Sequence, residues 1–171
     1  TGRLIRIYWG AAWLEGALDM SELTALTYLD CSTNEVNSLN VNKNLKLTYL
    51  DCAYNDEIAS LDLSRNVELT YLDCCYNRLN SLDISNNTAL TYLNCHVNQL
   101  SNLDVNQNTK LEKIICSDNK LSALDVSKNT KLVTLWCDNN ELSSLNVSQN
   151  TSLKELRCSA NQLSTLDVSY N

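Results

Sequence analysis

Three residues of this chain have the side chains of a nucleophilic active site. Cys75, His96 and Asp73 offer a thiol, an imidazole base and a carboxylate to orient that base. The chain repeats about every 21 residues, and this repeat would place the three residues on neighbouring strands of an open surface. No pocket or oxyanion hole would exclude water there. We therefore predict no catalytic residues and no enzymatic activity. We expect Cys75 to be an exposed thiol that is prone to oxidation.

The other seven cysteines recur every 21 residues, with one step of 22 residues caused by an insertion between Asn55 and Leu61. Zinc sites use close pairs of ligands together with histidine, and this chain has a single histidine. Disulfides also fit poorly, because the series is odd in number and its side chains would run parallel. We expect buried, reduced thiols that act as small hydrophobic residues, with no metal and no cofactor. The series consists of Cys31, Cys52, Cys74, Cys95, Cys116, Cys137 and Cys158.

A column of carboxylates, Asp30, Asp51 and Asp73, is a second place where a metal could bind. Carboxylates at the same position of successive repeats suit oxygen-preferring divalent cations. A flat sheet offers few further ligands, however, so we expect solvated carboxylates that repel one another and hold no metal.

The cysteines belong to a repeat with the consensus LxxLxCxxNxLxxLDVSxNTx. Apolar residues alternate at the end of LxxLxC, which is the period of a β-strand, so Leu29 and Cys31 should face the core while Asp30 points outward. Stacked copies would pair these strands in parallel, about 4.8 Å apart. The second half of the repeat, LxxLDVSxN, alternates in the same way and predicts a second short strand or extended run on the convex side. A coil this short leaves little room for helix.

Two columns of asparagine mark the turns that follow the two phrases. A buried turn leaves backbone N–H and C=O groups without partners, and an asparagine amide carries both a donor and an acceptor. We expect each amide to satisfy its own turn and the neighbouring coil. The first column is Asn34, Asn55, Asn77, Asn98, Asn119, Asn140 and Asn161, and the second is Asn44, Asn66, Asn87, Asn108, Asn129, Asn150 and Asn171.

This repeat resembles that of the leucine-rich-repeat family, L-x-x-L-x-L-x-x-N-x-L, with cysteine in place of the third leucine. It is most similar to the short bacterial 21-residue class, which includes internalin surface proteins with a column of cysteines. The resemblance covers Leu26 to Asn171. It implies a mainly β fold: a right-handed solenoid with a parallel sheet on the concave face, short extended strands on the convex side and very little helix.

The whole chain, residues 1–171, is predicted to be a single domain with an irregular first coil (1–25) and seven repeats (26–171). Trp9 and Trp13 are expected to cover part of the open first coil. The last coil leaves an apolar edge and an unpaired strand, which predicts a longer native protein or end-to-end or edge association with another copy.

Charge and hydropathy exclude two classes of partner. The formal net charge is −7 and the thirteen basic residues are scattered, so we expect no nucleic acid partner. No apolar run approaches the roughly 20 residues of a membrane span, so we expect no direct membrane insertion.

The outward positions of the strands are where a partner would bind. The first four rungs repeat a Tyr–Asp pattern, whereas every outward position changes from Lys113 onward. Outward apolar residues are informative because folding does not require them there, and aromatic and arginine side chains are common interface anchors. The alternative is repeat drift, in which the tyrosines merely stack and Trp136 packs over Ile115. The predicted partner-binding residues are Tyr71, Tyr92, Val97, Ile115, Trp136 and Arg157.

The resemblance implies a bacterial cell-surface or secreted module for recognition or adhesion, which would bind a protein or carbohydrate ligand through the sheet face. Fold-level analogy is the only support for this expectation. The alternative is a structural spacer that has no ligand of its own. A binder should lose affinity when outward residues of the second half are changed, whereas a spacer should tolerate these changes.

Overall fold

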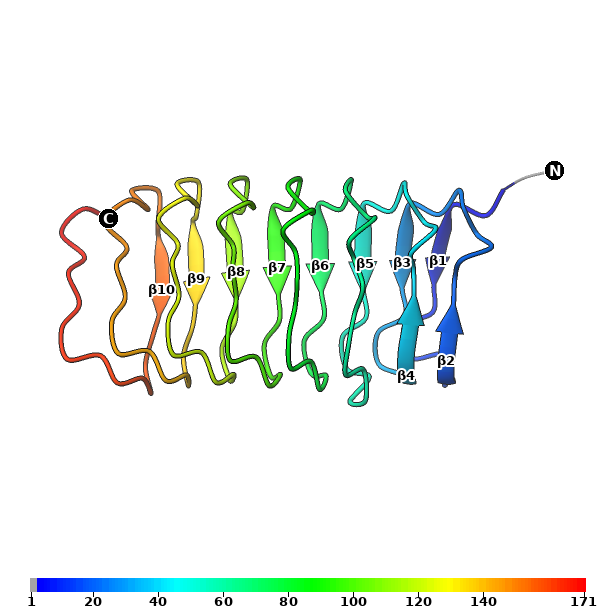
Figure 1. Ribbon diagram of the computed structural model, residues 1–171, viewed down its shortest axis with the longest axis horizontal. Coiled ribbons are helices and arrows are strands. Elements are labelled where there is room, and N and C mark those ends of the chain that lie inside the picture. The colour runs from blue at the N-terminus through cyan, green and yellow to red at the C-terminus, as the bar shows by residue number, and fades with distance from the viewer. Residues whose placement is uncertain (1–2) are drawn as a thin grey trace.

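The computed structural model describes residues 3–171, which form a solenoid of stacked coils (Figure 1). One strand from each coil joins an eight-stranded parallel sheet in the order β1-β3-β5-β6-β7-β8-β9-β10. We call the outer surface of this sheet the sheet face. The strands are β1 (Arg6–Tyr8), β3 (Tyr28–Asp30), β5 (Tyr49–Asp51), β6 (Tyr71–Asp73), β7 (Tyr92–Asn94), β8 (Lys113–Ile115), β9 (Thr134–Trp136) and β10 (Glu155–Arg157).

The register of this sheet stacks equivalent residues of successive repeats on one another, as the consensus predicts. Leu29 pairs with Leu50, Leu50 with Leu72 and Leu72 with Leu93. The leucines and the cysteine that follows each strand form one continuous core, in which Leu29 and Cys31 are fully buried. All eight cysteines are free thiols, as expected.

The wall opposite the sheet is extended, but most of it is not β-strand. Only β2 (Glu15–Asp19) and β4 (Glu35–Asn40) pair there, in a two-stranded parallel sheet. In the later coils a single backbone hydrogen bond links the opposite-wall segments of neighbouring coils. An example is the bond from the Gln99 N–H to the Leu79 carbonyl, at 2.8 Å. The predicted second short strand or extended run is therefore a paired strand in the first two coils and an extended, unpaired segment in the later ones.

The first asparagine column makes both kinds of hydrogen bond that its amides allow. The Nδ2 of Asn98 donates to the carbonyls of Cys95 in its own turn and of Cys74 in the preceding coil, at 3.1 and 3.0 Å. Its Oδ1 accepts the N–H of Leu79 at 2.9 Å. The expected double role is confirmed, because each of these amides connects two coils.

The second asparagine column uses mainly its donors. The Nδ2 of Asn108 donates to the carbonyls of Ile84 and Asn87 at 2.9 and 3.0 Å. The buried Oδ1 of Asn108 has no hydrogen-bond partner within residues 3–171, and five other members share this feature. The prediction that both groups are used therefore holds for the first column and only in part for the second.

The inserted residue in the third coil interrupts the first column at one point. Asp56 lies in the left-handed region with φ of 56°, directly after Asn55. The next member, Asn77, keeps its donor bonds to Cys52 and Cys74, but its Oδ1 has no partner among the described residues. The insertion thus costs one acceptor bond and leaves the stacking of the sheet intact.

The first coil packs only one of its two tryptophans. Trp9 is half-buried against the core, whereas 87% of Trp13 is exposed. The expectation that both cover the open coil is wrong for Trp13, since a φ of 58° at this residue directs the local backbone away from the extended path. Residues 3–171 include no helix long and apolar enough to cross a membrane.

Candidate functional site: the sheet face

A column of stacked tyrosines covers the first half of the sheet face. The rings of Tyr28, Tyr49, Tyr71 and Tyr92 lie nearly parallel, with neighbouring centroids 4.1 to 4.3 Å apart. Tyr8 continues the column at 4.7 Å with a tilted ring. Burial raises the pKa of Tyr49, Tyr71 and Tyr92, which favours neutral phenols. Because the ring faces cover one another, the column presents ring edges and hydroxyl groups to a partner.

Trp136 replaces the tyrosines as the main aromatic residue of the second half. Its ring lies between two cations, with the Arg157 guanidinium carbon 3.9 Å and the Lys113 ammonium 4.9 Å from the ring centroid. Lys113 also lies 5.8 Å from the centroid of Tyr92. Such cation–π contacts hold long basic side chains in defined positions. Arg157 is further fixed by Glu155, whose carboxylate lies 3.3 Å from the guanidinium.

A depression of about 320 Å³ lies beside these side chains and collects residues from six successive coils. Its aromatic walls are Tyr54, His96 and Trp136, and its acidic groups are Asp118 and Asp138. Cys75, Asn94, Ile115, Ser117 and Arg157 complete the lining. Its volume is at the low end of the range of about 300–1,000 Å³ that is usual for small-ligand sites.

Hydrogen bonds fix the acidic side of the depression. Asp138 accepts the N–H and the hydroxyl of Ser159 at 3.0 and 2.8 Å, and Ser117 donates to its second oxygen at 3.3 Å. Asp118 accepts the side-chain amide of Asn139 and lies 3.3 Å from the Nδ1 of His96. These carboxylates are held on the wall and are not free to collapse onto a neighbour.

Cys75, the possible nucleophile noted in the sequence, is buried and protonated. Only 4% of Cys75 is exposed, and burial raises the pKa of its thiol, with a further contribution from Asp73. The expectation of an exposed, oxidation-prone thiol is wrong. Cys75 stands in a column of small residues that larger neighbours cover, since Ala53 and Ser117 of this column are also buried.

His96 does not act on Cys75 in this arrangement. The Nδ1 of His96 lies 3.1 Å from the Ser117 carbonyl and 3.3 Å from Asp118, and its ring meets Tyr76 edge-on. The depression itself was not expected, because the sequence suggested an open surface at this point. The three candidate residues nevertheless form no triad, since the thiol is protonated and the base is directed elsewhere.

The aspartate column is partly buried. Burial, with smaller contributions from the neighbouring carboxylates Asp73 and Asp30, raises the pKa of Asp51 to about 6. Asp73 is itself buried and accepts the side-chain amide of Asn94 at 2.9 Å. Within residues 3–171 no three His, Cys, Asp or Glu side chains are grouped as a metal site. The expectation of solvated carboxylates is therefore wrong for Asp73, while the expected mutual repulsion is present.

Val97 lies in a left-handed turn that every repeat contains. The residue two positions after each ladder cysteine has a φ near 50°, and the series includes Thr33, Tyr54, Tyr76, Val97, Asp118, Asn139 and Ala160. Asn and Asp tolerate this conformation well, whereas a β-branched residue such as Val97 is strained in it. Local folding therefore gives no reason for a valine here.

The structure brings together three of the six predicted partner-binding residues. Ile115, Trp136 and Arg157 line the depression, although Ile115 is only 7% exposed and forms its floor. Tyr71 and Tyr92 lie in the adjacent tyrosine column, and Val97 lies on the turn beside His96. The prediction missed the other seven lining residues, Cys75, Asn94 and Ser117 and four with larger or charged side chains, and their place in the outward columns of the repeat was the only available signal. The four with larger or charged side chains are Tyr54, His96, Asp118 and Asp138.

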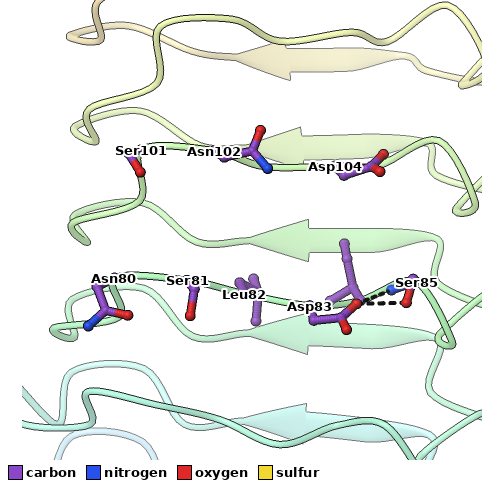
Figure 2. A pocket seen from close by; sticks show the side chains of 9 residues that line it. Asn80, Ser81, Leu82, Asp83, Ser85, Ser101, Asn102 and Asp104 are labelled. Atoms are coloured by element: carbon purple, nitrogen blue, oxygen red, sulfur yellow. Dashed lines mark hydrogen bonds between the residues drawn. The ribbon is translucent and has the colours of Figure 1, made fainter.

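A second hollow lies on the opposite wall, and Figure 2 shows the side chains around it. Asp83, one of its lining residues, accepts the N–H and the hydroxyl of Ser85 at 3.0 and 2.7 Å. The same Asp–Ser turn recurs in other coils, such as Asp62 with Ser64. These polar groups serve the turns of the repeat, so this hollow is structural.

Comparison with known proteins gives structural neighbours only, since the sequence matches no protein-family model and no curated protein. The functional domain of InlJ from Listeria monocytogenes, which includes a cysteine ladder, is 35% identical with a TM-score of 0.83. That alignment covers 91% of this chain and 40% of the solved InlJ domain. A leucine-rich-repeat protein of Leptospira interrogans is 26% identical with a TM-score of 0.80, covering 86% of this chain and 41% of that chain.

The plant peptide hormone receptor RGFR1, solved in complex with RGF2, is 23% identical with a TM-score of 0.75. The alignment covers 87% of this chain and 27% of the receptor, which shows a shared fold. This chain spans less than half the length of these three neighbours. The parallel sheet, the repeat length and the buried cysteine and asparagine columns all agree with these comparisons. The protein is a leucine-rich-repeat solenoid of about seven turns with a cysteine ladder.

Proposed function

We propose that this chain is a recognition module that binds a protein partner through the sheet face. The observation that carries the proposal is the depression beside Trp136, which combines aromatic walls, fixed carboxylates and a held arginine from separate coils. Packing of the repeat alone does not require such a mixture of side chains. Aromatic and arginine side chains are also the residues on which interface energy concentrates.

The same geometry favours a protein over a glycan. A sugar ring packs on the open face of an aromatic side chain, but the tyrosine faces cover one another and the Trp136 ring is occupied by Lys113 and Arg157. Apart from one face of Tyr54, the groups that remain are ring edges, hydroxyls and charged groups, and these suit hydrogen bonding with a polypeptide. The plant receptor with the same fold is solved with RGF2, which is consistent with a protein or peptide ligand.

We further propose that the module acts outside a bacterial cell, at the surface or after secretion. This part of the proposal rests on the similarity to InlJ of Listeria monocytogenes. The alternative of a spacer without a ligand predicts that the sheet face tolerates substitution.

The test is a binding screen of the domain against panels of host surface proteins, with a glycan array as a second arm. The wild type is compared with the triple variant Tyr92→Ala, Trp136→Ala, Arg157→Ala. The matched control is Ser81→Ala with Asn102→Ala, two exposed residues of the opposite wall that Figure 2 labels. Equal thermal stability of both variants is established first.

We expect the screen to find a protein that binds the wild type and the control variant equally. The same protein should bind the triple variant at least tenfold more weakly, because that variant lacks the interface anchors. Binding of no panel protein, or equal binding by the triple variant, would contradict the proposal and favour the spacer. If the triple variant instead loses binding of a glycan, the sheet face would remain the binding site. The proposal that the ligand is a protein would then be overturned.

A further inference from the structure

The charges around the depression are not balanced by the protein itself. Arg157 lies on the Trp136 ring and pairs with Glu155, so its charge is compensated within the wall. Asp118 and Asp138 have no lysine or arginine partner within residues 3–171. With Lys113 beside Trp136 also counted and His96 taken as neutral, the formal charges of Lys113, Arg157, Glu155, Asp118 and Asp138 still sum to −1, and Asp118 and Asp138 come from adjacent coils.

The acidic groups are fixed and partly exposed, as a binding site requires. Ser117 and Ser159 position Asp138, while Asn139 and His96 position Asp118. Both carboxylates are partly exposed and line the same concave surface. A ligand that binds there therefore meets acceptors that need little rearrangement, which lowers the cost of association.

The other walls suit the aliphatic stem and cationic head of a basic side chain. Tyr54 is 49% exposed and stacks one face on Tyr76 at 4.3 Å, while Ile115 provides an apolar floor. Aromatic rings attract cations and also pack against the methylene groups of lysine and arginine. A carboxylate ligand would instead meet Asp118 and Asp138, and a neutral one would leave their charge unmatched.

We propose that the depression between Tyr54, Asp118 and Asp138 receives one arginine or lysine side chain of the partner protein. This inference rests on the proposed function of the sheet face. It adds that the partner protein presents a basic residue at the centre of the surface that contacts this chain. Two basic residues of this chain, Lys113 and Arg157, border the site. Their positive charges would repel a second basic group of the partner, so the site is limited to one.

The direct test uses small probes in place of the unidentified partner. N-acetyl-arginine methylamide is titrated into the wild-type protein, and the indole N–H signal of Trp136 and the ring signals of His96 are followed by NMR. The indole signal is assigned with Trp136→Phe. N-acetyl-citrulline methylamide, a neutral analogue of nearly the same shape, and N-acetyl-glutamate methylamide are the comparison probes.

The variants Asp118→Asn and Asp138→Asn remove one charge each and keep an oxygen acceptor. Asp104→Asn, on the opposite wall (Figure 2), removes the same charge away from the depression. We expect saturable shifts with the arginine probe and none with the other two. Each depression variant should bind about fivefold more weakly, the size of a partly exposed ion pair, while Asp104→Asn should bind as the wild type does.

Equal binding of the citrulline probe, wild-type affinity in both depression variants, or no shift with the arginine probe would overturn the inference. The two proposals fail separately. A panel protein that needs Trp136 but binds Asp118→Asn and Asp138→Asn normally overturns the basic pocket alone. Arginine binding with no partner that needs the sheet face overturns the proposed function alone.

Discussion

Asp51 lies between two carboxylates of its own column, and the stacking of coils decides its protonation. Burial, together with Asp73 and Asp30, raises its pKa from 3.8 to about 6. The folded protein therefore holds this proton more tightly than the unfolded chain does. The favourable contribution of the protonated group is fully present below about pH 4 and is lost as the pH rises through about 6.

The substitution Asp51→Asn should remove this penalty at neutral pH. The amide keeps an oxygen that can accept the Ala53 N–H, which Asp51 accepts at 3.1 Å. We expect the Tm at pH 7.5 to rise by roughly 2–4 °C, the effect of about 1 kcal/mol in a domain of this size. The gain should disappear at pH 4, and thermal melts across this range measure it.

Asp83→Asn is the matched control with the opposite sign. Hydrogen bonds from the Ser85 side chain and backbone lower the pKa of Asp83, so its ionised form is favoured by folding. This variant should lower the Tm at pH 7.5. A gain for Asp83→Asn, or a loss for Asp51→Asn at that pH, would contradict the assignment of these carboxylates.

The asparagine columns hold one coil to the next at the scale of the turn. Asn77 and Asn98 occupy the same column and make equivalent donor bonds to cysteine carbonyls. They differ on the acceptor side, because Asn98 accepts the Leu79 N–H whereas the insertion leaves the oxygen of Asn77 without a partner among the described residues. The two positions form a natural pair for measuring one hydrogen bond.

We expect Asn98→Ala to cost more stability than Asn77→Ala, by about 1–2 kcal/mol. Both variants leave buried carbonyls without a donor, but only Asn98→Ala also leaves a backbone N–H unpaired. Urea unfolding followed by circular dichroism gives both free energies of unfolding. Equal losses would mean that the acceptor bond contributes little, and the insertion would then be energetically silent.

The whole solenoid shields its thiols because every coil covers the one before it. Seven of the eight cysteines are buried and Cys158 is partly exposed. Burial raises the pKa of Cys31 and Cys95 to about 12, so little thiolate forms at pH 8.

A chromogenic disulfide reagent should therefore label only Cys158 at an appreciable rate in the native protein. In denaturant under non-reducing conditions all eight thiols should react, because none is in a disulfide. Fewer than eight would reveal a disulfide. Fast native labelling that Cys75→Ser abolishes would contradict the burial of Cys75.

The sequence by itself determined the architecture. A coil of 21 residues contacts mainly its two neighbours, so a repeated pattern of leucine, cysteine and asparagine specifies strand, core and turn in every coil. The inward position of Leu29 and Cys31 and the double role of Asn98 follow from this local regularity.

Only the tertiary structure decided what the outward residues do. Whether Cys75 or Ile115 is exposed depends on the size and rotamer of side chains about 21 positions away, and both residues are covered. The depression beside Trp136 requires one to three side chains from each of six coils, and no single repeat contains its pattern. A repeat fixes the path of the backbone locally, whereas a surface site arises from differences between repeats that meet only when the coils are stacked.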